Sequence, residues 1–205
     1  MNVEGTAFPS STCEAITPPA VSRPTQLPIL RQVFADLDSI VAAEHLQPTL
    51  RNRFRVAIGL DAWLLLASFR IRQALKRRRV PIVGRLIRLV EMSLFGAELS
   101  LHATIGTGLY ITHSHGVVVG GTTIVGDHVK LLGSNTFGNR DGHGYDYPIV
   151  GSHVLVGAGA RILGSIAIGD GARIGANAVV TSDVADNVTV VGNPARPVVR
   201  DAIDQ

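Results

Sequence analysis

Two histidines, His113 and His115, lie in a short polar break within a regular, glycine-rich part of this sequence. An imidazole titrates near neutral pH, so it can take a proton from a hydroxyl, and its neutral form can also bind a metal ion. Side chains two residues apart in a strand point to the same side, so either histidine is a candidate for the same task. His128, His143 and His153 extend the set of potential zinc ligands.

A six-residue repeat surrounds these histidines. A large apolar residue, often followed by glycine, recurs every six residues from Val119 to Phe137 and again from Val150 to Val180. Such a period is typical of one flat face of a parallel β-helix, in which three units make one coil and each coil covers its neighbour. The sequence therefore predicts a mainly β fold, with a parallel β-helix over residues 98–198.

The repeat is interrupted twice. The first break spans residues 110–119 and contains both histidines, and the second is a polar, glycine-rich loop at residues 139–148. Such a loop cannot belong to the ladder of strands, so we expect it to project outward. Because a regular coil has no concavity of its own, we expect the functional site at these two breaks.

The composition and apolar spacing of the residues before the repeat predict a tail followed by a helical segment. Residues 1–27 are rich in Pro, Ser and Thr, include the single cysteine, Cys13, and do not form a secretory signal, which predicts a mobile tail and a cytoplasmic protein. Residues 28–97 predict helices at about 28–45, 49–79 and 81–95. No apolar run reaches the length of about 18 residues that a membrane span requires.

Positive charge is concentrated in this helical segment. Between Arg51 and Val90, eleven of the chain's 19 lysines and arginines accompany a single acid, Asp61. The pattern fits a solvated helical surface. It also fits a surface held against anionic lipid at the inner membrane, because Trp63 and Phe69 lie beside the cations. We expect no nucleic-acid binding, since no recognition motif accompanies the charge.

Four stretches of the sequence resemble the serine O-acetyltransferase branch of the hexapeptide-repeat acyltransferases. They are HATIGTGLYITH (102–113), GVVVG (116–120), VGAGARILG (156–164) and VGNPAR (191–196). The resemblance implies a left-handed parallel β-helix and a homotrimer, with acetyl-CoA as co-substrate in a groove between two subunits and no metal. The helical segment is shorter than in that family, which favours a plain trimer over paired trimers.

The resemblance also implies roles for individual residues. His113 matches the family's catalytic histidine, which takes the proton from the acceptor hydroxyl, and Glu98 stands where the family has an aspartate that holds the imidazole. Arg161 and Arg196 are candidates to offset the coenzyme's phosphate charge. The other expected coenzyme contacts are Gly138 and Asn139 at the thioester end, Ala158, Gly159 and Ala160 beside the pantetheine arm, and Gly175, Ala176, Gly192, Pro194 and Ala195 at the adenosine end.

This sequence departs from the family where a free amino acid would be held. Thr112 stands in place of an aspartate, Gly121 in place of a glutamate, and Asp146 and Tyr147 in place of an Arg–His pair. Serine would lose its charged partners, whereas an aromatic ring beside a carboxylate suits a sugar. We therefore predict a sugar or glycan precursor as acceptor, with His115 also lining its site. Serine O-acetylation is the alternative, and a zinc enzyme or a non-catalytic β-helix scaffold are alternatives of other classes.

Overall fold

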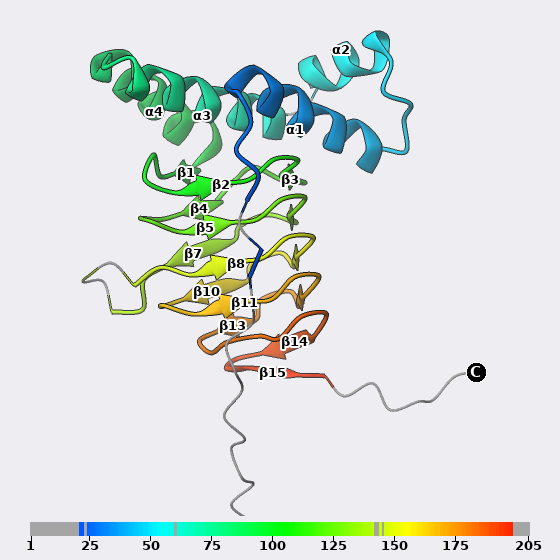
Figure 1. Cartoon of the computed structure of the whole chain (residues 1–205), viewed down its shortest axis with the longest axis vertical. Coiled ribbons are helices and arrows are strands. Elements are labelled where there is room, and N and C mark those ends of the chain that lie inside the picture. The colour runs from blue at the N-terminus through cyan, green and yellow to red at the C-terminus, as the bar shows by residue number, and fades with distance from the viewer. Residues whose placement is uncertain (1–20, 23, 60, 142–143, 145, 199–205) are drawn as a thin grey trace, which may run out of the picture.

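The computed structural model describes residues 21–22, 24–59, 61–141, 144 and 146–198, which form a helical layer on one end of a three-sided β-coil (Figure 1). The helices of the described part are α1 (Ile29–Ala43), α2 (Leu50–Gly59), α3 (Asp61–Arg77) and α4 (Pro81–Phe95). The helix predicted over 49–79 is therefore divided into α2 and α3. Asp61 lies in the first turn of α3, where the helix dipole favours a carboxylate. None of the described helices is long and apolar enough to cross a membrane.

Short strands follow the helices and form three sheets. Sheet A contains β1 (Glu98–Leu99), β4 (Val118–Val119), β7 (Thr136–Gly138), β10 (Arg161–Leu163) and β13 (Val179–Val180). Sheet B contains β2 (Thr104–Ile105), β5 (Ile124–Val125), β8 (Ile149–Val150) and β11 (Ala167–Ile168). Sheet C contains β3 (Tyr110–Ile111), β6 (Lys130–Leu131), β9 (Leu155–Val156), β12 (Arg173–Ile174), β14 (Thr189–Gly192) and β15 (Ala195–Pro197). All pairs are parallel except β14 with β15, and each coil runs from sheet A through B to C, which gives the predicted left-handed parallel β-helix.

One buried side chain from each strand builds the core. On sheet A, Leu99, Val119, Phe137, Ile162 and Val180 stack in register, and none is more than 1% exposed. Burying each such side chain contributes about 1.5–3 kcal/mol. Sheets B and C carry equivalent ladders, so the predicted repeat is confirmed as the core of the fold.

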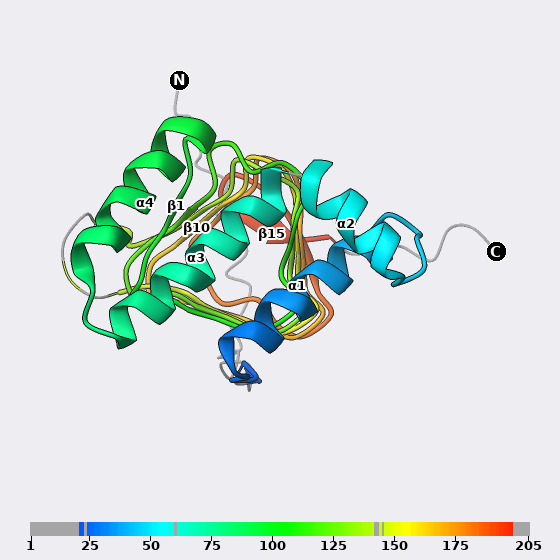
Figure 2. The ribbon, with the colours of Figure 1, turned by 90° about the horizontal axis from the view of Figure 1, so that it is seen from above.

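Helix α3 crosses the end of the β-helix diagonally (Figure 2). A buried arginine on this helix joins the helical layer to the first coil. Arg70 forms an ion pair with Asp36 of α1, with 3.0 Å between Nε and Oδ2, and donates to the carbonyl oxygen of Ile105 at 2.9 Å. In the described part of the chain, β2 is the end strand of its sheet, so the arginine satisfies a carbonyl that no neighbouring strand reaches.

A second arginine makes the same kind of contact on the other side of α3. Arg72 pairs with Glu91 of α4 at 2.6 Å and donates to the carbonyl oxygen of Leu99 at 2.9 Å. Arg70 and Arg72 are both buried, so the prediction that they belong to an exposed basic surface is wrong. The carbonyls at the end of the coil need donors, and these two side chains supply them.

Part of the predicted tail lies against the β-helix. The hydroxyl of Ser22 hydrogen-bonds to Asp170 at 2.9 Å, and the backbone amide of Thr25 donates to Asp127 at 3.0 Å. Residues 21–27 are thus held by polar contacts where they are described, and residues 1–20 lie outside the described part. The loop at 139–148 leaves the coil between β7 and β8, and β8 returns in register with β5.

Candidate active site

The turns from sheet C to sheet A stack on one another and form one edge of the β-helix, the C–A edge. These turns are residues 112–117, 132–135, 157–160 and 175–178, and the β14–β15 hairpin ends the edge. Backbone hydrogen bonds join successive turns, with Ser134 N donating to His115 O at 3.2 Å and Gly159 N to Gly133 O at 2.9 Å. Strands lie about 4.8 Å apart, so four steps along the edge cover about 19 Å.

The first of these turns, residues 112–117, carries both histidines and is the histidine corner. His113 and His115 are exposed, and Ser114 between them is buried. Strand β3 ends at Ile111, so the two histidines lie in a turn. The expectation that they point to the same side rests on strand geometry and does not apply.

A carboxylate from the helical layer reaches this corner. Asp61, at the start of α3, accepts a hydrogen bond from the hydroxyl of Ser114, and its Oδ2 lies 3.9 Å from Nδ1 of His115. Partial burial raises the pKa of Asp61, but hydrogen bonds from Ser114 and from backbone amides outweigh it and hold the pKa below its ordinary value. Asp61 is therefore ionised at neutral pH. The sequence offered one signal for it, a lone acid within a basic segment.

Glu98, expected to hold the ring of His113, has a different partner. It is the first residue of β1 and forms an ion pair with Arg88 of α4. Among the described residues, no hydrogen bond joins Glu98 to His113, so the expected contact is not found there. The physical reason is that α4 places a guanidinium directly beside the carboxylate.

Thr112, at the start of the histidine corner, has a buried hydroxyl with no hydrogen-bond partner in the described chain. Leaving a buried hydroxyl unpaired costs about 1–3 kcal/mol. The backbone amide of Thr112 donates to the carbonyl oxygen of Leu131 at 2.9 Å, which fixes the residue in place. The side chain is thus held where it could hydrogen-bond to a bound molecule or water.

Gly121 and Tyr147 form one packing unit at the turn from sheet A to sheet B. Gly121 has a φ of +44°, and a Cβ built there would lie 2.0 Å from Cζ of Tyr147. The aromatic ring occupies the space that any side chain at position 121 would need. Packing against this ring therefore requires glycine at position 121. Asp146, which precedes the tyrosine, is exposed.

Most of the expected coenzyme residues lie on the C–A edge below the histidine corner. They are Ala158, Gly159, Ala160 and Arg161 after β9, Gly175 and Ala176 after β12, and Gly192, Pro194, Ala195 and Arg196 at the last hairpin. Gly138 instead ends β7 and Asn139 follows it, at the turn from sheet A to sheet B, where the inserted loop with Asp146 and Tyr147 also lies. Within one chain, the residues after β9 and β12 and at the last hairpin thus share an edge with the histidines. Gly138 and Asn139 lie on another edge.

The remaining histidines lie elsewhere. His128 and His153 stack with their ring centroids 5.2 Å apart at the turns from sheet B to sheet C. Across the described residues, no three His, Cys, Asp or Glu side chains are close enough to hold a metal ion. His143 lies outside the described residues.

Known proteins share this architecture. The family model "Bacterial transferase hexapeptide (six repeats)" matches residues 147–182. The chain is 38% identical over 155 residues to the serine acetyltransferase of Helicobacter pylori, a match that covers 75% of this chain and 91% of that protein. The chain belongs to the serine acetyltransferase family. The solved soybean serine acetyltransferase complexed with serine is similar at a TM-score of 0.74 and 33% identity, over 83% of this chain and 69% of that one. A serine acetyltransferase in complex with CoA is similar at a TM-score of 0.73 and 29% identity, over 83% and 69%.

This member of the serine acetyltransferase family is an O-acetyltransferase that uses acetyl-CoA, as predicted. The predicted sugar or glycan acceptor is wrong, because the relatives are serine acetyltransferases and one of them is solved with serine. The prediction counted the acids missing at positions 112 and 121. It overlooked Asp61, which brings a carboxylate to the corner from the helical layer. The comparisons do not support contact with a membrane, and the cytoplasmic location stays a prediction.

Proposed function

We propose that this protein is a serine O-acetyltransferase, which moves the acetyl group of acetyl-CoA to the hydroxyl of free serine. The histidine corner carries the proposal. It combines two exposed imidazoles, the ionised carboxylate of Asp61 at 3.9 Å from His115, and the buried hydroxyl of Thr112, which has no hydrogen-bond partner among the described residues. These groups lie at one end of the C–A edge. The relatives that act on serine support the same acceptor.

In this proposal His113 is the general base. Its ring takes the proton from the serine hydroxyl while that oxygen attacks the carbonyl carbon of the thioester. The carbon–sulfur bond then breaks, and the proton held by His113 passes to the leaving thiolate. The products are O-acetylserine and free CoA, and no other reactant is needed.

Asp61 and Thr112 would hold the acceptor. The ionised carboxylate of Asp61 would attract the ammonium group of an amino acid, because the two charges are opposite. Near a protein surface such a pair contributes a few kcal/mol at most. The hydroxyl of Thr112, which has no partner among the described residues, would gain a hydrogen bond to the bound serine. Serine would thus find one charged and one polar partner beside His113.

The coenzyme would lie along the C–A edge. The small residues Ala158 and Gly159 leave room for a pantetheine arm next to the backbone, and Arg161 and Arg196 are exposed where they could approach phosphate groups. Four coil steps of about 4.8 Å each allow an extended molecule to run from the histidine corner to the last hairpin.

A complete site would need a second subunit, and we propose a homotrimer. Gly138, Asn139 and the end of the inserted loop lie on a different edge from His113, so a neighbouring chain must bring that edge to the histidine corner. Helix α4 supports such assembly, because Ile82, Leu86, Leu89 and Leu94 are large apolar side chains that are each more than half exposed.

The proposal is tested by release of free thiol from acetyl-CoA, with serine, homoserine and several sugars as acceptors. We expect kcat/KM for serine to exceed that for every other acceptor and to reach at least about 10⁴ M⁻¹ s⁻¹. A thermal shift with acetyl-CoA but no turnover of serine would contradict the acceptor and leave the coenzyme assignment in place. The absence of both would indicate a non-catalytic scaffold.

A further inference from the structure

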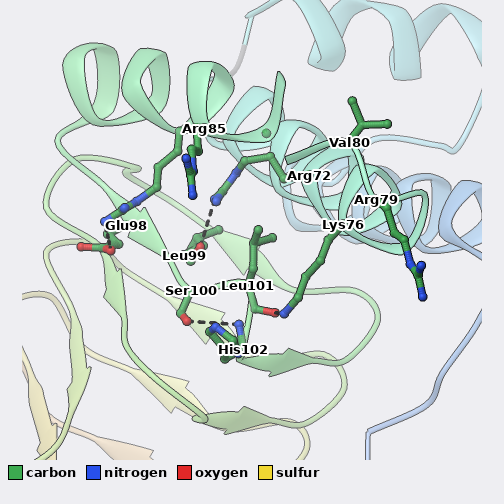
Figure 3. Close-up of a pocket in the computed structure, with 12 residues that line it drawn as sticks. Arg72, Lys76, Arg79, Val80, Arg85, Glu98, Leu99, Ser100, Leu101 and His102 are labelled. Atoms are coloured by element: carbon green, nitrogen blue, oxygen red, sulfur yellow. Dashed lines mark hydrogen bonds and ion pairs between the residues drawn. The ribbon is translucent and has the colours of Figure 1, made fainter. Parts of the chain in front are cut away.

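A basic cavity of about 610 Å³ lies between α3, α4 and the start of the first coil (Figure 3). Five cationic side chains line it, together with one carboxylate, Glu98, and one histidine, His102. The cations are Arg72, Lys76, Arg79, Arg85 and Arg88. This cavity has no role in the acetyl transfer proposed above.

Backbone contacts hold two of these cations in the wall. Arg72 is buried and donates to the carbonyl oxygen of Leu99, and Nζ of Lys76 donates to the carbonyl oxygen of Leu101 at 3.1 Å. Their positions are thus set before any ligand arrives, which lowers the cost of ordering them on binding.

Two further cations of the cavity are free to bind a ligand. Arg79 and Arg85 are exposed, and among the described residues their side chains have no hydrogen-bond or ion-pair partner. Figure 3 shows the side chain of Arg85 directed from α4 toward the segment that begins at Leu99. Guanidinium groups bind phosphate and sulfate oxygens through paired hydrogen bonds, and repulsion among neighbouring cations falls when an anion enters.

We propose that this cavity binds a small anion that carries phosphate or sulfate groups. The site is distinct from the C–A edge, because the proposed phosphate-binding residues of the coenzyme, Arg161 and Arg196, lie in the fourth and fifth coils, whereas the cavity lies at the first. The proposal does not depend on serine as acceptor, since binding is measured without turnover.

Glu98 competes with the anion for one of the cations. Its carboxylate is paired with Arg88, so this guanidinium must be shared or released when an anion enters. Removing the charge of Glu98 should therefore strengthen binding, whereas removing the charge of Arg85 should weaken it. A general attraction to positive charge would give the same two signs, so a built site is recognised by a loss of affinity in the Arg85 variant that removal of an exposed cation outside the cavity does not cause.

The experiment is calorimetric titration of the full chain with inorganic pyrophosphate at low salt. We expect Arg85→Gln to weaken binding about tenfold, equivalent to about 1.4 kcal/mol, and Glu98→Gln to tighten it about threefold. Arg51→Gln is the matched control, since Arg51 is an exposed helical arginine outside the cavity. A saturating concentration of CoA should leave the affinity for pyrophosphate unchanged.

Several outcomes would overturn the proposal. One is the absence of saturable binding by the unaltered chain, and another is an equal loss in Arg85→Gln and Arg51→Gln. Displacement of pyrophosphate by CoA would assign the cations to the coenzyme site. Binding to phosphatidylglycerol vesicles that pyrophosphate does not reverse would assign them to a lipid surface. A change of oligomeric state in Arg85→Gln, without any binding of pyrophosphate, would assign them to a subunit contact.

Discussion

Replacing Asp61 by Asn removes the charge at the histidine corner while keeping the size of the side chain and an oxygen that can accept from Ser114. A charge-assisted contact with an ammonium group contributes about 1.5–3 kcal/mol. The side chain of Asp61 is 41% exposed, so water screens the interaction and the lower limit applies. We therefore expect kcat/KM for serine to fall about tenfold.

The assay is thiol release with each substrate varied in turn. The KM for serine should rise in Asp61→Asn, and the KM for acetyl-CoA should stay within about twofold of its original value, because the coenzyme does not depend on this charge. Asp38→Asn is the control, since Asp38 is another helical aspartate and pairs with Arg53 away from the corner. An unchanged KM for serine in Asp61→Asn, or an equal change in Asp38→Asn, would refute the role of Asp61.

The same variant has a pH signature. The pKa of Asp61 in the folded chain lies below the value of about 4 found in unfolded chains, so its ionised form stabilises the fold at neutral pH. That contribution is lost as the pH falls through the folded pKa. Denaturant titrations should show Asp61→Asn less stable than the unaltered chain at pH 7, by at most about 1 kcal/mol, and the two equal in strong acid.

Three further predictions concern the corner, the inserted loop and the helical layer. His113→Ala should lower turnover by about 100-fold or more with little change in acetyl-CoA affinity measured by calorimetry, and the same loss in His115→Ala alone would move the base to His115. Gly121→Ala should destabilise the fold by about 1–3 kcal/mol in denaturant titrations, because its Cβ meets the ring of Tyr147, and this cost should shrink in a Tyr147→Ala background. Arg70→Met should cost about 3–5 kcal/mol in the same titrations, because Asp36 would remain buried without its partner, and a loss under 1 kcal/mol would contradict this account.

The six-residue period determined the β-helix by itself. Each apolar residue such as Val125 or Val156 meets its equivalent in the next coil, so the local repeat contains the long-range pairing as well. The helices were predictable for a similar reason, since their apolar spacing is local, although the break before Asp61 was not. The motifs around His113 also sufficed to identify the family and its use of acetyl-CoA.

Contacts between the helical layer and the coil were decided only by the tertiary structure. Asp61 reaches Ser114 across 53 positions of sequence, and Arg70 pairs with Asp36 across 34. No period or motif links such residues. From the sequence alone, Thr112 therefore indicates that an acid is missing, whereas in the fold Asp61 of another element supplies one. Charge shows that a side chain needs a partner, but the choice of partner depends on which elements pack together, and that depends on the whole fold.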